Sequence, residues 1–240
     1  MGTLTETSAL HQKAFNETFA TEGIDWHWDE PTYRSLLHHV GGANRILTYA
    51  AGRSGQAPID ADRAAELHAR KTERYAELVR STPLELRPGV ERLRAEAKSA
   101  GIKRGLATGT SLDNIEASLD ATGNRIKLDD FDAYTLASMI ERAKPAPDAH
   151  RRCLELLAVD PAEALAIEDS ADGVASAVDG GLAVVATPGR FVSGQDFSRA
   201  AMVLSSLGDP DQHAERLDGQ LGPDGGIATL DWLTATLGLT

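Results

Sequence analysis

Hydroxyl, ammonium and carboxylate side chains stand at three places in the chain where an apolar or proline-stiffened segment meets a helical pattern. Thr108 follows "GLA", Lys144 precedes "PAPD", and Glu168 and Asp169 follow "LAI". Hydroxyls and backbone amides can hold a phosphate, and a fixed ammonium neutralises its charge. Two adjacent carboxylates attract a divalent cation. These residue types predict the binding or transfer of a phosphoryl group.

The segment "LATGTS" supplies the hydroxyls of Thr108, Thr110 and Ser111. At a junction between a strand and a helix, such groups can bind phosphate. Ser and Thr are also favoured as ordinary helix N-caps. The segment therefore has two interpretations, a phosphate loop or a simple cap.

The segment "AKPAPDAH" places Lys144 before two prolines, and Pro147 and Asp148 open a predicted helix. Because proline fixes φ, the approach to Lys144 is stiff. A positioned ammonium suits a transferring phosphoryl group. The alternative is a solvated lysine ahead of a helix that starts with proline.

The segment "LAIEDSADG" places Glu168 and Asp169 at the end of an apolar strand. Adjacent buried carboxylates repel each other unless a cation offsets the cost. Oxygen ligands with few protein contacts suit Mg²⁺. The alternative is N-capping of the next helix by Asp169 or Ser170.

The periodicity of apolar residues changes near residue 84. Before this point it is helical. The first predicted helix stops at Gly23, and its apolar stripe consists of Leu10, Ala14, Phe15 and Phe19. A later helix carries a second stripe, which consists of Ala65, Leu67, Leu78 and Val79. We predict an all-helical region here.

After residue 84, short apolar strands alternate with helices. A helix is predicted over 90–100 and a strand over 102–107, in which Gly105 is expected to cost packing. The pattern predicts an α/β fold, a parallel sheet with helices on both faces. Ligands bind such sheets at the carboxyl ends of the strands. The three polar segments should therefore meet.

Composition narrows the class of partner. The chain has 240 residues with 24 basic and 36 acidic side chains, for a net charge of −12. This balance argues against binding to nucleic acid, which needs clustered cations. The single cysteine, Cys153, excludes an internal disulfide and indicates a reducing compartment. No apolar run reaches membrane-spanning length, so we expect a cytoplasmic protein without a membrane partner.

The order of the three segments resembles the second, third and fourth motifs of the haloacid dehalogenase superfamily. "GTLTETSALHQKAFN", "LHARKTERY", "LRPGV", "LATGTSLDN", "KPAPD" and "EDSADG" together resemble its CbbY-like phosphatases, which are relatives of β-phosphoglucomutase. The resemblance implies a Rossmann-like core with an inserted helical cap. It places a remnant of the first motif at 1–7, the cap at 8–84 and the core at 85–240.

The resemblance also implies Mg²⁺ as cofactor and a small phosphorylated sugar as substrate. Thr108 would hydrogen-bond the phosphoryl group, Lys144 would neutralise it, and Asp169 would ligate Mg²⁺ with Glu168 beside it. Positioning and charge stabilisation are what phosphoryl transfer needs. Thr110, Ser111 and Asn114 match the loop on the phosphate side.

Several cap residues match substrate-facing positions of that family. They are His11, Gly41, Gly42, Arg45, His68 and Lys71. Arg45, with its forked donors, is the best candidate for a distal second phosphate. His11 and His68 have an equally acceptable interpretation as members of a polar helix face. Ala43 replaces a lysine that is usual in the family, which weakens the case for a bisphosphate.

The opening of the chain departs from the family. The family's aspartate nucleophile would fall two residues before Met1, and its acid/base aspartate aligns with Met1. Methionine can do neither task, so the chain as given is expected to be inactive. The first strand, in the middle of the sheet, would be missing as well. A start assigned too late or a truncation is the favoured explanation, and a genuine pseudoenzyme is the alternative.

The predicted function is therefore a Mg²⁺-dependent phosphatase, with xylulose-1,5-bisphosphate as the substrate that the resemblance implies. Two alternatives stay open, a non-catalytic protein that binds phosphosugars and a mutase like β-phosphoglucomutase. A monomer is expected from the family's habit.

Overall fold

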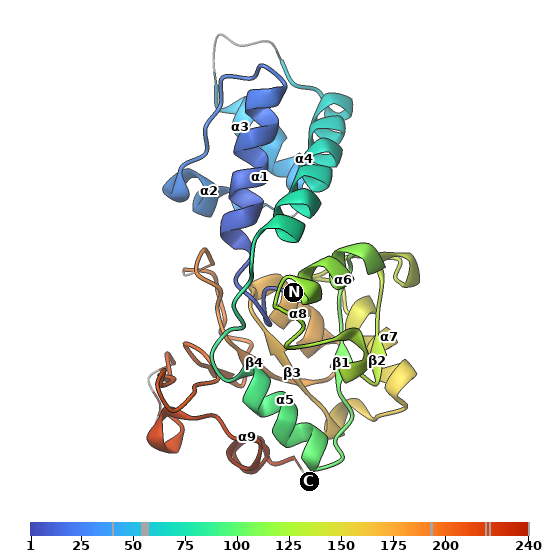
Figure 1. Ribbon diagram of the computed structural model, residues 1–240, viewed down its shortest axis with the longest axis vertical. Helices are drawn as coiled ribbons and strands as arrows, with labels where there is room; N and C mark the ends of the chain where they lie inside the picture. Colours follow the sequence, from blue (N-terminus) through green and yellow to red (C-terminus); the bar gives the residue numbers. More distant parts are fainter. Residues whose placement is uncertain (40, 54–57, 193, 219, 221, 240) are drawn as a thin grey trace.

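Four helices form one end of the molecule, and the strands with the remaining helices form the other (Figure 1). The computed structural model describes the whole chain except residues 40, 54–57, 193, 219, 221 and 240. We call the four-helix region the cap; its helices are α1 (Ser8–Thr21), α2 (Glu30–Leu36), α3 (Gly42–Ala51) and α4 (Ala61–Ser81). The rest, which we call the core, begins after α4.

All strand pairs in the core are parallel, as the sequence predicts. The strands belong to two sheets: β1 (Gly105–Leu106) with β2 (Ala133–Tyr134), and β3 (Leu165–Glu168), β4 (Ala183–Ala186) and β5 (Met202–Val203) in that order. The core helices are α5 (Val90–Ser99), α6 (Leu112–Asp120), α7 (Asp148–Leu157), α8 (Ala171–Asp179) and α9 (Leu230–Leu237). This is the predicted α/β class.

Two sequence predictions about local packing are wrong in detail. On α4, Ala64 is fully buried and Ala65 is exposed, so Ala64 takes the place predicted for Ala65 in the apolar stripe, while Leu67, Leu78 and Val79 are buried as predicted. Strand β1 covers two residues of the predicted 102–107. Its pairing within the described residues is with β2 alone, so β1 is an edge strand, and edge strands are often very short.

A cavity of about 880 Å³ separates β1 from β3. Its walls are largely apolar and include residues of both strands, of α5 and of α7. Met1, Thr3 and Leu4 also line it. Since no ladder joins β1 to β3 among the described residues, both strands present backbone groups toward this space. The predicted absence of a central strand thus has a counterpart in the structure, a gap between the two sheets.

Two linkers run side by side between cap and core, the segment before α1 and the segment between α4 and α5. Thr5 and Leu86 form an antiparallel bridge, and the Arg87 N–H donates to the Leu4 carbonyl at 2.9 Å. The Arg87 guanidinium donates to the Thr187 carbonyl at 2.7 Å and to the Pro188 carbonyl at 3.0 Å. Both linkers are therefore tied to the loop that follows β4.

The same loop reaches into the cap. Phe191 is 3% exposed and packs in the aromatic cluster of the cap, with its ring 5.8 Å from that of Tyr33. The Arg34 guanidinium lies over the Phe191 ring, and Arg190 pairs with Glu30 at 2.9 Å. One core side chain thus completes the interior of the cap.

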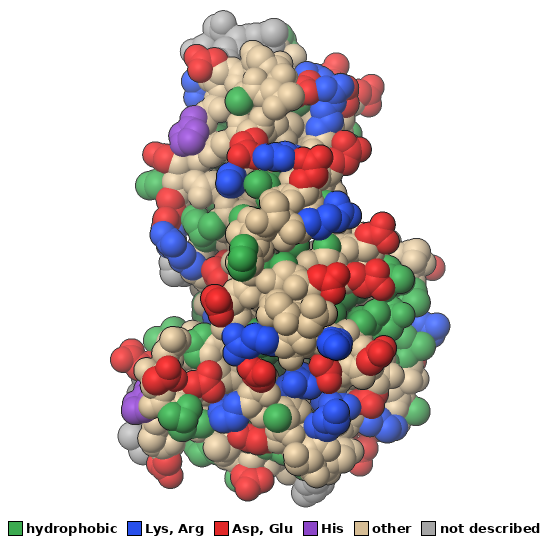
Figure 2. All heavy atoms as spheres, viewed as in Figure 1, with side chains coloured by type: hydrophobic (Ala, Val, Ile, Leu, Met, Phe, Trp, Pro, Cys, Tyr) green, Lys and Arg blue, Asp and Glu red, His purple; other side chains and the backbone are tan. Residues whose placement is uncertain are grey.

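Outer surfaces carry mixed charge. Figure 2 shows acidic and basic side chains interspersed over one face of both regions. Within the described residues, no helix combines the length and the apolar character needed to cross a membrane.

Gly105 is a site of close approach rather than a packing defect, which corrects the sequence prediction. A Cβ there would lie 2.5 Å from Cys153 Sγ and 2.9 Å from Leu157 Cδ1. Helix α7 can therefore pack on β1 only because Gly105 has no side chain.

We expect Gly105→Ala to lower the free energy of unfolding by about 1–3 kcal/mol, because the added methyl overpacks this contact. Urea denaturation measures the loss. Adding Cys153→Ala removes the nearest obstructing atom and should recover part of it. An alanine variant as stable as the original chain would show that α7 does not press on β1.

Candidate active site

Thr108 lies directly after β1 and is held by Thr135. The Thr108 N–H donates to Thr135 Oγ1 at 2.9 Å, and the Thr135 hydroxyl donates to the Thr108 carbonyl at 2.8 Å. Thr108 is buried and lines the cavity. Its backbone is therefore fixed, and the residue borders the space between β1 and β3.

The residues after Thr108 organise the start of α6. Ser111 is the N-cap and accepts the Asn114 N–H at 3.4 Å. Asn114 Nδ2 donates to Thr110 Oγ1 at 3.2 Å. The structure gives Ser111 the capping role that was one of its two interpretations, while Thr110 and Asn114 form a polar pair at the same helix end.

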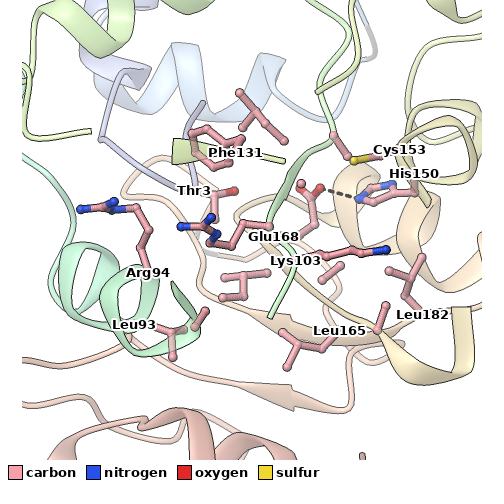
Figure 3. A pocket seen from close by; sticks show the side chains of 18 of the residues that line it. Thr3, Leu93, Arg94, Lys103, Phe131, His150, Cys153, Leu165, Glu168 and Leu182 are labelled. Carbon is pink, nitrogen blue, oxygen red and sulfur yellow. Dashed lines mark ion pairs between the residues drawn. The ribbon is translucent and has the colours of Figure 1, made fainter. Parts of the chain in front are cut away.

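Lys144 and His150 both hold the carboxylate of Glu168. Lys144 Nζ donates to Glu168 Oε1, and His150 Nε2 lies 2.9 Å from the same oxygen. Figure 3 shows His150 and Glu168 pointing toward each other from α7 and the end of β3. Burial raises the pKa of Glu168, but Lys144 and His150 more than offset this and bring it to about 2. Glu168 is therefore a buried, ionised carboxylate.

Asp169 is not used as a cap. Ser170 caps α8 by accepting the Gly173 N–H at 3.2 Å. The Thr3 hydroxyl donates to Asp169 Oδ1 at 3.0 Å, and a Cβ on Gly2 would lie 2.2 Å from Oδ2. Gly2 therefore lets the backbone of the first segment approach the Asp169 carboxylate closely.

The carboxylates of this region fit Mg²⁺ through Asp169. Mg²⁺ is usually held by one or two carboxylates with waters and substrate phosphates. Glu168 Oε1 is already shared by Lys144 and His150. In the described part of the chain, no group of three or more His, Cys, Asp or Glu is arranged around a possible metal position. Asp169 would therefore supply one carboxylate ligand to a bound Mg²⁺, with the charge of Glu168 beside it.

A second group of polar side chains lies in the cap. Lys71 Nζ is 2.7 Å from His11 Nδ1, and the His11 ring stacks on Tyr75 with centroids 3.8 Å apart. Burial, with the nearby Arg45 charge, lowers the pKa of Lys71 to about 7. Burial and the Lys71 charge lower the pKa of His11 well below its usual value. The His11 imidazole is therefore neutral, and the Lys71 ammonium beside it loses its proton more easily than an ordinary lysine.

Arg45 and His68 extend this group along α3 and α4. The Arg45 Nε donates to the His39 carbonyl at 3.0 Å. The His68 ring lies against Gly42, where a Cβ would be 2.2 Å from ring Cδ2. Burial lowers the pKa of His68 as well. Among the described residues, neither Arg45 nor Lys71 forms an ion pair with a carboxylate, so the cluster attracts anions.

Thr110, Ser111 and Asn114 lie together at the start of α6. The other predicted site residues form two groups. The core group is Thr108, Lys144, Glu168 and Asp169, all lining one cavity. The cap group is His11, Gly42, Arg45, His68 and Lys71, and Gly41 precedes α3 with φ 85°. His150 was not among the predicted residues. The sequence did carry one signal for it: His150 follows Lys144 by six positions, on a helix that Pro147 opens.

A helical region over a parallel α/β core, with Thr, Lys and Asp after successive strands, defines a class of hydrolase. The family model of the haloacid dehalogenase-like hydrolases matches residues 1–181, and the chain belongs to that family. Protein CbbY of Rhodobacter capsulatus is 42% identical over 206 residues, covering 86% of this chain and 90% of that protein.

Solved structures agree with this assignment. CbbY from Rhodobacter sphaeroides in complex with phosphate is 41% identical and has a TM-score of 0.75, covering 86% of this chain and 91% of that chain. A mutant of that protein in complex with xylulose-(1,5)bisphosphate has a TM-score of 0.76 at 40% identity, covering 88% and 92% of the two chains. The β-phosphoglucomutase of Clostridium difficile, at 18% identity and a TM-score of 0.68, shares the fold.

Proposed function

We propose that this protein is a Mg²⁺-dependent phosphatase that acts on a small phosphorylated sugar. The observation that carries the proposal is the pairing of two anion-attracting groups. Thr108, Lys144 and Asp169 all line the cavity in the core. Arg45 and Lys71 stand in the cap without carboxylate partners among the described residues. A phosphoryl group and a distal anionic group of one substrate would satisfy both.

Each side chain then has a role that its chemistry allows. The Thr108 hydroxyl would donate to a phosphoryl oxygen, and Lys144 would neutralise the charge that grows on the phosphoryl group. Asp169 would hold Mg²⁺, which when bound supplies further neutralisation of phosphate oxygens. Thr110 and Asn114 would orient the substrate at the start of α6.

The cap group favours a substrate with a second phosphate. Arg45 offers forked donors, and Lys71 gains an anionic partner that it lacks in the free protein. His11 and His68 would complete the polar surface around the sugar. Because a related CbbY was crystallised with xylulose-(1,5)bisphosphate, we propose a pentulose bisphosphate of this kind as the first substrate to test.

The nucleophile is the missing part of this mechanism. Among the described cavity-lining residues, Glu168 is committed to Lys144 and His150, and Asp169 to the metal in this proposal. The gap between β1 and β3 has room and unpaired backbone for one extended strand. We propose that a strand ahead of Met1, ending in Asp-x-Asp, fills this gap and brings the nucleophile next to Lys144.

The test is to supply that strand. A hydrophobic strand of about five to six residues, ending in Asp and one spacer residue, is placed before the chain together with Met1→Asp. We expect phosphate release from a sugar bisphosphate that chelation of Mg²⁺ abolishes. The control has Asn in place of the added nucleophile and should be inactive. A folded, extended chain that is inert on a broad panel of phosphosugars would contradict the proposal.

A non-catalytic phosphosugar-binding protein is the second candidate, and the cap group favours it because those cations need no added strand. The unaltered chain should then fold and gain about 2.7 kcal/mol of stability at a sugar phosphate concentration 100 times Kd. An unaltered chain that does not fold on its own would exclude this candidate and leave the phosphatase proposal standing.

A further inference from the structure

His150 lies among the residues of the core group without a role in the proposed reaction. It is 4% exposed and projects from α7 toward the end of β3. Its Nδ1 is 2.8 Å from Ser176 Oγ on α8, and the Ser176 hydroxyl is 2.7 Å from the Ala146 carbonyl. Both ring nitrogens are therefore engaged, and the ring is held between two elements.

The acceptor of His150 is the oxygen that Lys144 also holds. Since an ionised carboxylate only accepts hydrogen bonds, Nε2 carries the hydrogen in its 2.9 Å contact with Glu168 Oε1. The other oxygen, Oε2, packs against Gly173, where a Cβ would lie 2.0 Å away. The carboxylate is thus fixed on both sides while sharing one oxygen between two donors.

The shared contact with Glu168 Oε1 matters if Lys144 leaves Glu168 for another anion. The Glu168 side chain is 7% exposed. If Lys144 were its only donor, the departure of Lys144 would leave the Glu168 charge buried without compensation, which is strongly unfavourable. Lys144 is 23% exposed and borders the cavity, so its ammonium can turn toward an anion there. His150, locked by Ser176, cannot follow.

We propose that His150 is a positioning residue that keeps the Glu168 carboxylate in place, so that Lys144 can turn from it to a bound phosphoryl group. This role of His150 rests on the proposed function only in that the anion bound by Lys144 is taken to be a phosphoryl group. The shared oxygen itself is a property of the chain and can be tested without any ligand.

The first test is a double-mutant cycle on thermal unfolding with His150→Phe and Lys144→Met, neither of which keeps a side-chain donor. Each single variant leaves Glu168 one donor, whereas the double variant leaves it none. We expect the double variant to lose at least about 3 °C more than the two single losses combined, which is the shift that about 1 kcal/mol of coupling gives in a chain of this size. Additive losses would overturn the proposal.

A second pair of variants keeps this test decisive if the double variant fails to fold. His150→Gln retains an N–H donor, so it should fold in the Lys144→Met background and show near-additive losses. Failure of that variant too would mean that the ring is needed for packing alone, and the proposal would fall. Arg152→Gln, an exposed change on the same helix, serves as the control and should not couple to Lys144.

The second test uses inorganic phosphate as the probe, titrated into the unaltered chain by calorimetry. His150→Phe should weaken phosphate binding about tenfold, His150→Gln less than threefold and Arg152→Gln not at all. In the Lys144→Met background the His150→Phe change should have no further effect on affinity. An equal effect in both backgrounds would overturn the proposal. Coupling in unfolding together with no phosphate binding by the unaltered chain would instead reject the phosphoryl role of Lys144 and the proposed function.

Discussion

Replacing Lys71 with methionine should make the free protein more stable and remove its response to sugar phosphates. Lys71 is 5% exposed, and its neighbours are His11 Nδ1 and the rings of Phe15 and Tyr75, about 5 Å from its Nζ. Cation–π contacts stabilise a desolvated ammonium by only about 2 kcal/mol. A methionine of similar length fills the space without a buried charge, and we expect a gain of about 1–4 kcal/mol at pH 7.

The pH dependence of stability follows from the pKa of Lys71, about 7 in the folded protein against a usual 10.5. Between these values the unfolded chain binds the proton and the folded chain does not. The free energy of unfolding therefore rises as pH rises from 7 to 10.5, by up to about 5 kcal/mol. Lys71→Met should lack this rise. An anion in the cap favours the charged ammonium, so sugar phosphates should bind best below pH 7.

Urea denaturation at pH 7 and pH 10, with and without a sugar phosphate, measures these effects. Lys13→Met, an exposed change on α1, is the matched control and should keep both the rise and the response to ligand. If the two methionine variants behave alike, the cap cluster is not an anion site.

Glu168 should make the protein sensitive to acid over a defined range. Its pKa is about 2 in the folded protein and about 4.5 as the usual value. Because the folded-state pKa is depressed, the stabilisation is present above pH 4.5 and is lost as pH falls toward 2. The difference amounts to about 3 kcal/mol. Glu168→Gln should cost this amount at neutral pH, and the two proteins should converge in stability near pH 2.

Guanidinium denaturation as a function of pH measures the convergence. Glu116→Gln, on the exposed face of α6, is the control and should follow the original chain at every pH. A constant gap between the Glu168→Gln variant and the original chain down to pH 2 would mean that Glu168 is not held as an ionised partner of Lys144 and His150.

Much of the fold and of the core group could be predicted because strand ends are marked in the sequence. Apolar stretches ending at Thr108 and Glu168 indicate parallel strands, and the carboxyl ends of such strands meet at one edge. Which residue of "EDSADG" caps the next helix could be decided only by the structure. Both Asp169 and Ser170 can cap a helix, and the backbone of α8 selects Ser170.

The rest depended on contacts between distant segments, which spacing does not encode. Gly105 looks like a defect in a strand until α7 is placed against it. His150 resembles an ordinary buried residue of a helix face until β3 brings Glu168 within reach. The low pKa of Lys71 likewise arises from burial by α1 and from Arg45 on α3. In each case the decisive partner lies on another element.

The Phe191 ring has a consequence for the order in which the protein acquires its structure during synthesis. The cap segment emerges from the ribosome first, and domains generally fold in that order. Its aromatic interior nevertheless includes a side chain that is made only after β1 to β4. The cap helices can form early, but their packing is completed only when the loop after β4 arrives. The region that would select the substrate therefore matures last, together with the core that would carry out the chemistry.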